Sequence, residues 1–317
     1  MRIILMPFRI FTMICTTVCL LASLLGCSPA QRAPLFDGAH AYHWLKAQVE
    51  LGPRYPGSPG HLAAYNLITS EVKKYASKCY TQEFEVWVNN KRTKLTLRNI
   101  IAVFNPQAED YVLLAAHWDT RPTADCEVTA ESRKQPIPGA NDGASGVAVL
   151  LELARIFHQN RPDIGVLMVF FDGEDYGPTE SDMFLGSRYF AKNWSERIPV
   201  AHRPIRIRYG ILLDMVGDKN LTIYQEGHSV KAAPEIVEKV WSAASELGYG
   251  KYFPKQEKYT IQDDHVFLIN AGIKCIDIID FDYAPWHTLQ DTQDKCSAQS
   301  LAIVGRIVER VIYSEKM

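Results

Sequence analysis

The chain has 317 residues, of which 47% are hydrophobic and 22% are charged, and its formal net charge is −2. This composition is typical of a globular protein. Because there is no surplus of basic residues, nothing indicates a nucleic-acid partner. The sequence contains no internal repeat and no low-complexity tract, which argues against a repeat architecture.

The N-terminus is predicted to be an export signal. Arg2 and Arg9 precede an apolar stretch, residues 10–25, that is shorter than the ~20 residues a membrane-spanning helix needs. The sequence LLGC, ending at Cys27, resembles the lipobox of bacterial lipoproteins and implies lipid attachment to Cys27; an ordinary secretory signal is the alternative. We therefore expect a lipoprotein signal peptide at 1–26, a tether at 27–35 and a lipid-anchored, periplasm-facing or exported protein of the bacterial cell envelope.

Seven cysteines are present, and they show no C-x-x-C spacing, so a cysteine zinc site is not expected. An exported compartment permits disulfides, but buried free thiols are equally consistent with the sequence. The sequence therefore leaves open whether the four other cysteines of the predicted mature domain form disulfides. They are Cys79, Cys126, Cys275 and Cys296.

The predicted elements alternate in type along the chain. Helical apolar spacing predicts helices at 36–50, 61–75, 144–157, 233–247 and 301–313. Short runs rich in Val, Ile and Leu predict buried strands at 99–104, 111–117, 164–172, 209–217 and 275–281. Such alternation indicates an α/β sheet covered by helices on both faces. No linker divides the body, so we expect one catalytic domain over 36–317.

Polar clusters follow the predicted strands directly. They are His117-Trp118-Asp119, Asp172-Gly173-Glu174-Asp175, Asp214 and Trp286-His287, and Asp142 stands at the start of a predicted helix. In α/β sheets, ligands bind where the carboxyl ends of the strands meet. Burying several carboxylates close together is energetically unfavourable unless a cation is bound between them. A ligand set of carboxylates and imidazoles, with no thiolate, is typical of catalytic zinc sites. The alternative is that these residues cap helices, as Asp142 could.

Glu174 and Asp175 are neighbours, so they cannot both point the same way at a strand end. One carboxylate can bind the metal while the other serves as a proton shuttle. This is the usual division of labour in zinc sites.

The motif order HWD, GANDGASG, FFDGEDYG, LLDMVG, QDDHVFL, WHT resembles that of the zinc-dependent aminopeptidase and glutaminyl cyclase family. The resemblance spans about residues 95–292. It implies a single doubly wound domain built on a mixed, mostly parallel central sheet.

The two branches of this family differ in chemistry. The aminopeptidases activate water between two zinc ions, which would take His117, Asp142, Asp175, Asp214 and His287 as ligands. The cyclases use the α-amine of an N-terminal Gln to attack its own γ-carboxamide, releasing ammonia, and one zinc suffices.

Two features favour the cyclase branch. Trp286 stands directly before His287, and residues 262–265 read QDDH, as in the cyclases. We therefore expect a glutaminyl-peptide cyclotransferase that converts the N-terminal Gln of exported peptides or proteins to pyroglutamate. The alternatives are a dinuclear zinc aminopeptidase and a non-catalytic binding module on the same fold.

Carried over by position, the resemblance implies that Asp142, Asp175 and His287 bind one Zn²⁺. It implies that Glu174 is the general acid/base. The same resemblance makes Asp214 and Asp263 a hydrogen-bonded acidic pair, in which one carboxyl can stay protonated.

The remaining expectations concern the second metal position and the pocket. His117 is a possible second metal ligand, and Trp286 is expected to form a wall of the substrate pocket. Animal cyclases have a further Trp in their pocket that this chain lacks, so Trp118 or Tyr176 is expected to replace it. Asp277 stands where they place a His, and it is expected either in the pocket's proton network or as a plain strand residue.

Overall fold

The structure is a computed structural model that describes residues 36–197 and 205–316. The described residues belong to one compact unit, Ala33–Met317. The predicted signal peptide, Cys27 and the tether up to residue 35 lie outside the described residues. Among the helices of the described ranges, none has the length and apolar character needed to cross a bilayer.

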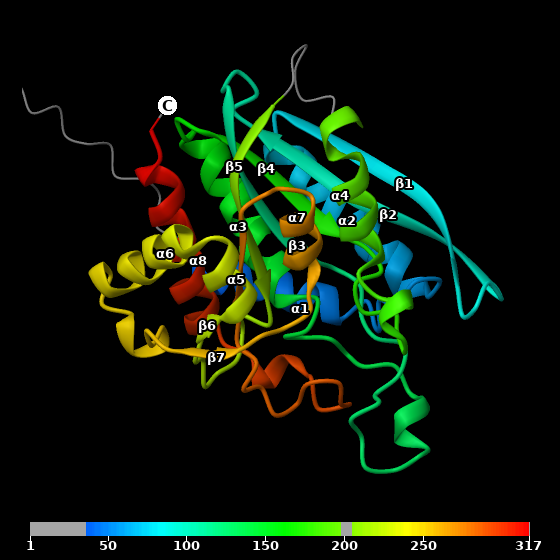
Figure 1. Ribbon diagram of the computed structural model, residues 1–317. Helices are drawn as coiled ribbons and strands as arrows, with labels where there is room; N and C mark the ends of the chain where they lie inside the picture. The colour runs from blue at the N-terminus through cyan, green and yellow to red at the C-terminus, as the bar shows by residue number, and fades with distance from the viewer. Residues whose placement is uncertain (1–35, 198–204, 317) are drawn as a thin grey trace, which may run out of the picture. The chain divides into compact units, whose positions relative to one another are not determined.

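A six-stranded sheet forms the centre of the domain, in the order β1-β2-β4-β3-β5-β8 (Figure 1). Its strands are β1 (Lys78–Val88), β2 (Thr93–Phe104), β3 (Asp110–His117), β4 (Gly165–Phe171), β5 (Arg206–Asp214) and β8 (Cys275–Ile279). β1 and β2 are antiparallel to their neighbours, whereas β4, β3, β5 and β8 run parallel. The predicted α/β fold with a mixed, mostly parallel sheet is confirmed.

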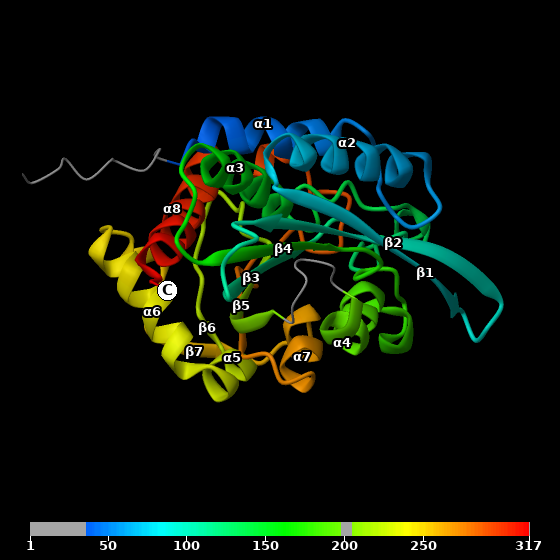
Figure 2. The same cartoon turned by 90° about the horizontal axis from the view of Figure 1, so that it is seen from above.

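Helices cover both faces of this sheet, as Figure 2 shows. One face carries α1 (Gly38–Val49), α2 (Pro59–Tyr75), α3 (Ser145–Gln159) and α8 (Ala298–Ser314), with α6 (Pro234–Glu246) packed beside α8. The other face carries α4 (Leu185–Arg197), α5 (Gly227–Ala232) and α7 (Asp264–Asn270). This two-sided cover explains why the central strands β3 and β4 are buried along nearly their whole length.

Each face has its own core. The larger core joins the first helix layer to the sheet and includes Phe104, Phe157 and Trp241. The smaller core lies on the opposite face, where Phe171 of β4 meets Phe190 of α4 edge to face. The described cysteines Cys79, Cys126, Cys275 and Cys296 are free thiols.

Short elements complete the domain. β6 (Gln225–Glu226) pairs with β7 (Glu257–Tyr259), and single 3₁₀ turns lie at Ser132–Lys134, Glu180–Asp182, Gly250–Tyr252 and Gln293–Lys295. The sequence did not predict β1, α4, α5 or α7. β1 is an edge strand whose side chains are mostly exposed or half-buried, so it lacks the apolar run that marks the inner strands.

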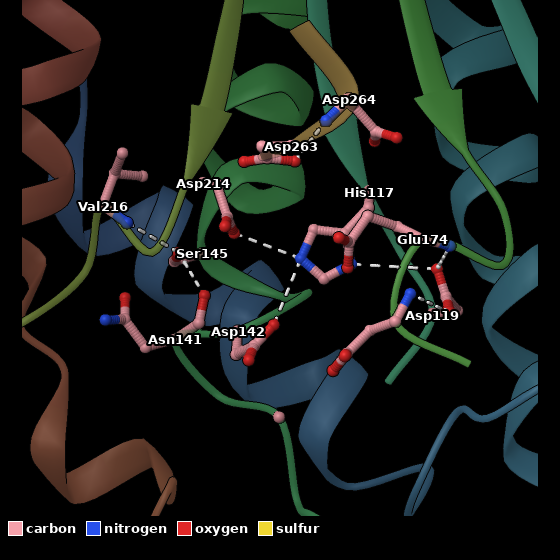
Figure 3. Close-up of polar contacts among 12 residues, drawn as sticks. His117, Asp119, Asn141, Asp142, Ser145, Glu174, Asp214, Val216, Asp263 and Asp264 are labelled. Carbon is pink, nitrogen blue, oxygen red and sulfur yellow. Dashed lines mark hydrogen bonds and ion pairs between the residues drawn. The ribbon is translucent and has the colours of Figure 1, made fainter. Parts of the chain in front are cut away.

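The parallel strands place the functional residues at one edge. β3 ends at His117, β4 ends just before Asp172 and β5 ends at Asp214, all at the carboxyl edge of the sheet. The loop that leads into α3 brings Asp142 to the same edge (Figure 3). Chain segments far apart in sequence therefore meet in one place.

Candidate active site

A cavity of about 120 Å³ opens at this edge of the sheet. Carboxylates and an imidazole line one part of it, and apolar side chains line the rest. The lining residues are Asp142, Glu174, Asp175, Met183, Phe184, Asp214, Met215, Ile261, Gln262, Asp263, Ile279, Phe281, Trp286 and His287. All of the predicted zinc ligands and catalytic residues belong to this set.

The structure brings together the three predicted zinc ligands. One ligand atom from each of Asp142, Asp175 and His287 lies within 4.8 Å of the others. Nε2 of His287 is 3.5 Å from Oδ1 of Asp175 and 3.7 Å from Oδ2 of Asp142. Oδ2 of Asp175 is buried and has no hydrogen-bond partner. A buried carboxylate oxygen of this kind fits a metal ion, and two carboxylates with one imidazole suit zinc.

Each of these ligands is held by a second carboxylate. Asp291 accepts hydrogen bonds from the backbone N–H groups of Asn141 and Asp142, at 2.8 and 3.2 Å. Oδ1 of Asp125 lies 3.0 Å from Nδ1 of His287. A carboxylate bonded to the far nitrogen fixes the tautomer and orientation of a metal-binding His.

The third supporting carboxylate is Asp119. Its two oxygens accept from the backbone N–H groups of Glu174 and Asp175, at 3.0 and 3.2 Å. It thereby fixes the turn after β4, in which the adjacent side chains diverge. Asp175 reaches the predicted zinc ligands, and the Glu174 carboxylate points toward His117 (Figure 3).

A second group of ligand atoms lies beside the first. His117, Asp142 and Asp214 also place one ligand atom each within 4.8 Å of one another. Nε2 of His117 is 3.1 Å from Oδ1 of Asp214 and 3.2 Å from Oδ1 of Asp142 (Figure 3). Asp142 belongs to both groups, so its two oxygens can face two metal positions.

Asp214 and Asp263 line the same cavity. Asp214 contacts His117, and Oδ1 of Asp263 accepts from the backbone N–H of Asp264. The expected hydrogen bond between the two acids stays a prediction. Burial and the nearby charge of Asp214 raise the pKa of Asp263 to about 6.

The cavity has a strongly negative potential. Burial opposes a charge on His287, yet Asp175, Asp125 and Asp142 raise its pKa to about 10. Burial also raises the pKa of Glu174 well above its usual range, and Asp175 and Asp263 add to this effect. An environment that favours protonation of an imidazole and of a carboxylate also favours a bound cation.

The guanidinium of Arg121 is a cationic group of the protein that already lies in this negative potential. Nη1 of Arg121 lies 2.5 Å from Oδ1 of Asp175, and the guanidinium also contacts Asp125. Burial alone would raise the pKa of Asp175, but His287 and Arg121 more than offset this, so the net shift is downward. Asp175 is therefore held as a carboxylate.

Aromatic side chains close the apolar part of the cavity. The Trp286 ring stacks on His287 with centroids 3.8 Å apart, and Phe281 contacts it at 5.1 Å. Trp118 does not reach the cavity: its indole is fully buried, stacks on His61 and donates to the carbonyl of Arg98. Neither Trp118 nor Tyr176 is among the residues that line the cavity, whereas Phe184 and Phe281 are.

Asp277 also lies away from the cavity wall. Its carboxyl is buried behind Asp263, with Oδ2 at 3.8 Å from Nδ1 of His265. Ligand atoms of Asp263, His265 and Asp277 lie within 4.8 Å of one another. Burial raises the pKa of Asp277 well above its usual range, and the charge of Asp263 adds to the shift.

Four supporting residues were given no role of their own by the sequence analysis: Asp119, Arg121, Asp125 and Asp291. Asp119 and Asp291 stand close to His117 and His287 in the sequence, and that proximity was an available signal. Arg121 and Asp125 lie in an irregular loop with no motif around them. Only the fold shows that this loop lies against His287, where the N–H of Cys126 donates to the His287 carbonyl.

Comparisons with known proteins agree with this geometry. The profile of peptidase family M28 matches residues 99–312. The glutaminyl-peptide cyclotransferase of Bos taurus is 26% identical over 286 residues, which cover 81% of this chain and 76% of that protein.

Two solved structures are more similar. The glutaminyl cyclase of Bacteroides thetaiotaomicron bound to N-acetylhistamine is 40% identical, with a TM-score of 0.84, covering 90% of this chain and 100% of that one. A Zn-dependent exopeptidase from Parabacteroides distasonis is 41% identical, with a TM-score of 0.84, covering 89% of this chain and 100% of that one. The chain therefore belongs to peptidase family M28, and it is an enzyme whose clustered carboxylates and imidazole suit zinc.

Proposed function

We propose that this enzyme is a zinc-dependent glutaminyl cyclase that converts the N-terminal Gln of peptides to pyroglutamate and releases ammonia. One observation carries the proposal. The ligand group of Asp142, Asp175 and His287, the Glu174 carboxylate and the Trp286 wall all face one cavity of about 120 Å³. The similarity to solved and curated glutaminyl cyclases supports the same assignment.

In this proposal Asp142, Asp175 and His287 hold a single Zn²⁺. The metal supplies Lewis acidity toward the γ-carboxamide oxygen of the substrate Gln. The Gln side chain lies in the cavity against Trp286. The cavity orients the α-amine and the carboxamide of one residue for a five-membered ring closure. This positioning lowers a large part of the activation barrier.

The protons are carried by Glu174. Its carboxylate takes a proton from the α-amine as the nitrogen attacks Cδ. The nitrogen is therefore neutral once the new N–Cδ bond has formed. The same carboxyl then gives that proton to the departing NH₂ group as its bond to Cδ breaks, and ammonia leaves. Asp119 positions Glu174 for this step through the backbone hydrogen bond described above.

A dinuclear aminopeptidase is the second candidate, because one specific observation favours it. The group of His117, Asp142 and Asp214 offers a second metal position that shares Asp142 with the first. The likeness to a Zn-dependent exopeptidase is as high as the likeness to the cyclase. In that case two zinc ions would hold a water molecule, and the product would be a free amino acid.

A pair of peptides that differ only in the first residue, Gln or Leu, distinguishes the two activities. We expect the zinc-loaded enzyme to release ammonia from the Gln peptide and to leave the Leu peptide intact by mass spectrometry. Release of free Leu or free Gln would instead support the aminopeptidase. Metal binding with neither product would support a binding module.

We also propose that the mature protein is anchored to the bacterial cell envelope through lipid on Cys27 and acts on exported substrates. Support comes from the LLGC sequence, residues 24–27, at the end of the apolar segment 10–25. A Cys27→Ser variant should lose incorporation of labelled fatty acid and leave the membrane fraction. Unchanged membrane association of this variant would contradict the anchor.

A further inference from the structure

A third group of ligand atoms lies on the outer side of His287. Asp125, Cys126 and His287 each place one ligand atom within 4.8 Å of the others. Cys126 is exposed and its thiol is free, and Asp125 is also exposed, so this group is accessible to ions from solvent. It is distinct from the two inner groups, which share no residue with it except His287.

The two ring nitrogens of His287 face opposite ways. Nε2 faces the inner carboxylates of Asp142 and Asp175, at 3.7 and 3.5 Å. Nδ1 faces outward, 3.0 Å from Oδ1 of Asp125. One imidazole therefore links the catalytic cavity to the outer group.

The outer ligand atoms are fixed in place by neighbouring contacts. Oδ2 of Asp125 accepts from Nε and Nη2 of Arg121, at 3.0 and 2.8 Å, so Oδ1 is the oxygen left to face His287. The N–H of Cys126 donates to the carbonyl of His287 at 3.2 Å, which holds the thiol beside the imidazole.

We propose that Oδ1 of Asp125, Sγ of Cys126 and Nδ1 of His287 form an outer metal site for a thiophilic divalent cation, such as Cd²⁺ or excess Zn²⁺. A thiolate, an imidazole nitrogen and a carboxylate oxygen are the donor types that Zn²⁺ accepts, and the thiolate favours soft metals. Binding releases the thiol proton and the Nδ1 proton to solvent.

Occupation of this site inhibits the enzyme. A metal on Nδ1 replaces the hydrogen bond through which Asp125 orients His287, and the inner ligand loses its fixed tautomer and direction. Inhibition at the outer site rests on the proposed function of the inner site, whereas metal binding to Cys126 does not.

The test is a Cd²⁺ titration of the mature holoenzyme with zinc already bound. The readouts are the ultraviolet absorption of a cadmium–thiolate bond, the zinc retained after the titration, and ammonia release from a Gln peptide. We expect one such bond per chain and a fall in turnover of roughly tenfold, the lower end for lost support of a metal ligand.

Cys126→Ala and Cys126→Ser should lose the absorption and resist inhibition, relative to their own turnover without Cd²⁺. Cys79→Ala, which removes a half-buried thiol elsewhere, should behave as the wild type.

Three results would overturn the proposal. Absence of the thiolate absorption, or its persistence in Cys126→Ala, would show that Cys126 is not a ligand. Equal inhibition of the wild type and Cys126→Ala would place the inhibitory ion at the inner groups. If no protein releases ammonia from the Gln peptide, the proposed function fails, yet the absorption titration still decides whether the outer site binds metal.

Discussion

Glu174 is the residue on which the proposed chemistry depends most directly. Replacing it by Gln keeps its size but removes the proton acceptor, so ammonia release should fall at least ~100-fold, as for loss of a general acid–base group. Zinc content should stay unchanged, because Glu174 is not among the proposed zinc ligands. Glu180→Gln, at an exposed carboxylate nearby, is the matched control and should retain full turnover. Normal turnover of Glu174→Gln would remove this residue from the mechanism.

Asp125 contributes to zinc binding indirectly, because it orients the proposed ligand His287. Asp125→Asn removes the charge that stabilises the Nδ1–H of His287, so zinc affinity should fall ~10–100-fold. The measurement is a competition between the protein and a chelator of known affinity. Asp163→Asn, an exposed acid on the loop before β4, should not change the affinity. Equal affinities in the two variants would contradict the role of Asp125.

At the scale of single residues, the sequence indicated the inner ligands because each follows an apolar strand or begins a helix. This pattern placed Asp142, Asp175 and His287 among the candidates, the family resemblance singled them out as zinc ligands, and the structure brings them together. Trp118 was misplaced although it belongs to the same HWD motif as His117. Its neighbour in sequence faces the site, while the indole points into the core beside His61. The direction of a side chain at the end of a strand depends on how it packs against the rest of the fold, and the HWD motif alone does not determine this packing.

Among the elements, α3 matters most because its N-terminal loop carries Asp142. Gly146 in its first turn lies against β5: an added Cβ would be 2.2 Å from the carbonyl oxygen of Leu213 and 2.9 Å from Cβ of Ala116. Gly146→Ala should therefore move α3 away from the sheet and lower the free energy of unfolding by roughly 1–3 kcal/mol. Zinc affinity should fall with it, because Asp142 moves with the helix.

Gly250→Ala is the control for this variant, since an added Cβ there meets no atom closer than 3.8 Å. Thermal unfolding and zinc competition should distinguish the two proteins. A Gly146→Ala protein with wild-type melting temperature and zinc affinity would show that the approach of α3 to β5 does not position Asp142.

Elements with long apolar runs were predictable, and elements without them were not. The inner strands and α3, α6 and α8 follow directly from periodicity, because they are buried along most of their length. α5 has only six residues, which is too short for a helical periodicity to be recognised, and Glu226 caps its N-terminus. α7 begins at the QDDH motif, whose acidic residues obscured the helical pattern.

Over the whole molecule, a contact between the two ends of the described domain gives a pH prediction. Glu309 of α8 accepts a hydrogen bond from the N–H of Phe36 at 3.1 Å. Burial, aided by the charge of Glu152, raises the pKa of Glu309 to about 7 from the usual 4.5. An acid whose pKa is raised on folding contributes stability below its unfolded pKa, and this stability is lost as pH rises through the folded pKa.

The wild type should therefore lose stability between about pH 5 and about pH 8, and Glu309→Gln should lose less over the same range. Melting temperatures measured at constant zinc concentration compare the two proteins. An identical pH dependence in both would mean that Glu309 does not ionise differently on folding. The sequence could not predict this contact, because it joins residues 36 and 309 and neither belongs to a motif.

The most direct test of the central claim is zinc reconstitution of the chelated enzyme with a Gln-initiated peptide, following ammonia and pyroglutamate together. The account predicts no turnover without metal and full turnover at one zinc per chain, with pyroglutamate as the product. Activity that needs a second equivalent of zinc, with free Gln as the product, would contradict the cyclase and show that the group of His117, Asp142 and Asp214 completes an aminopeptidase.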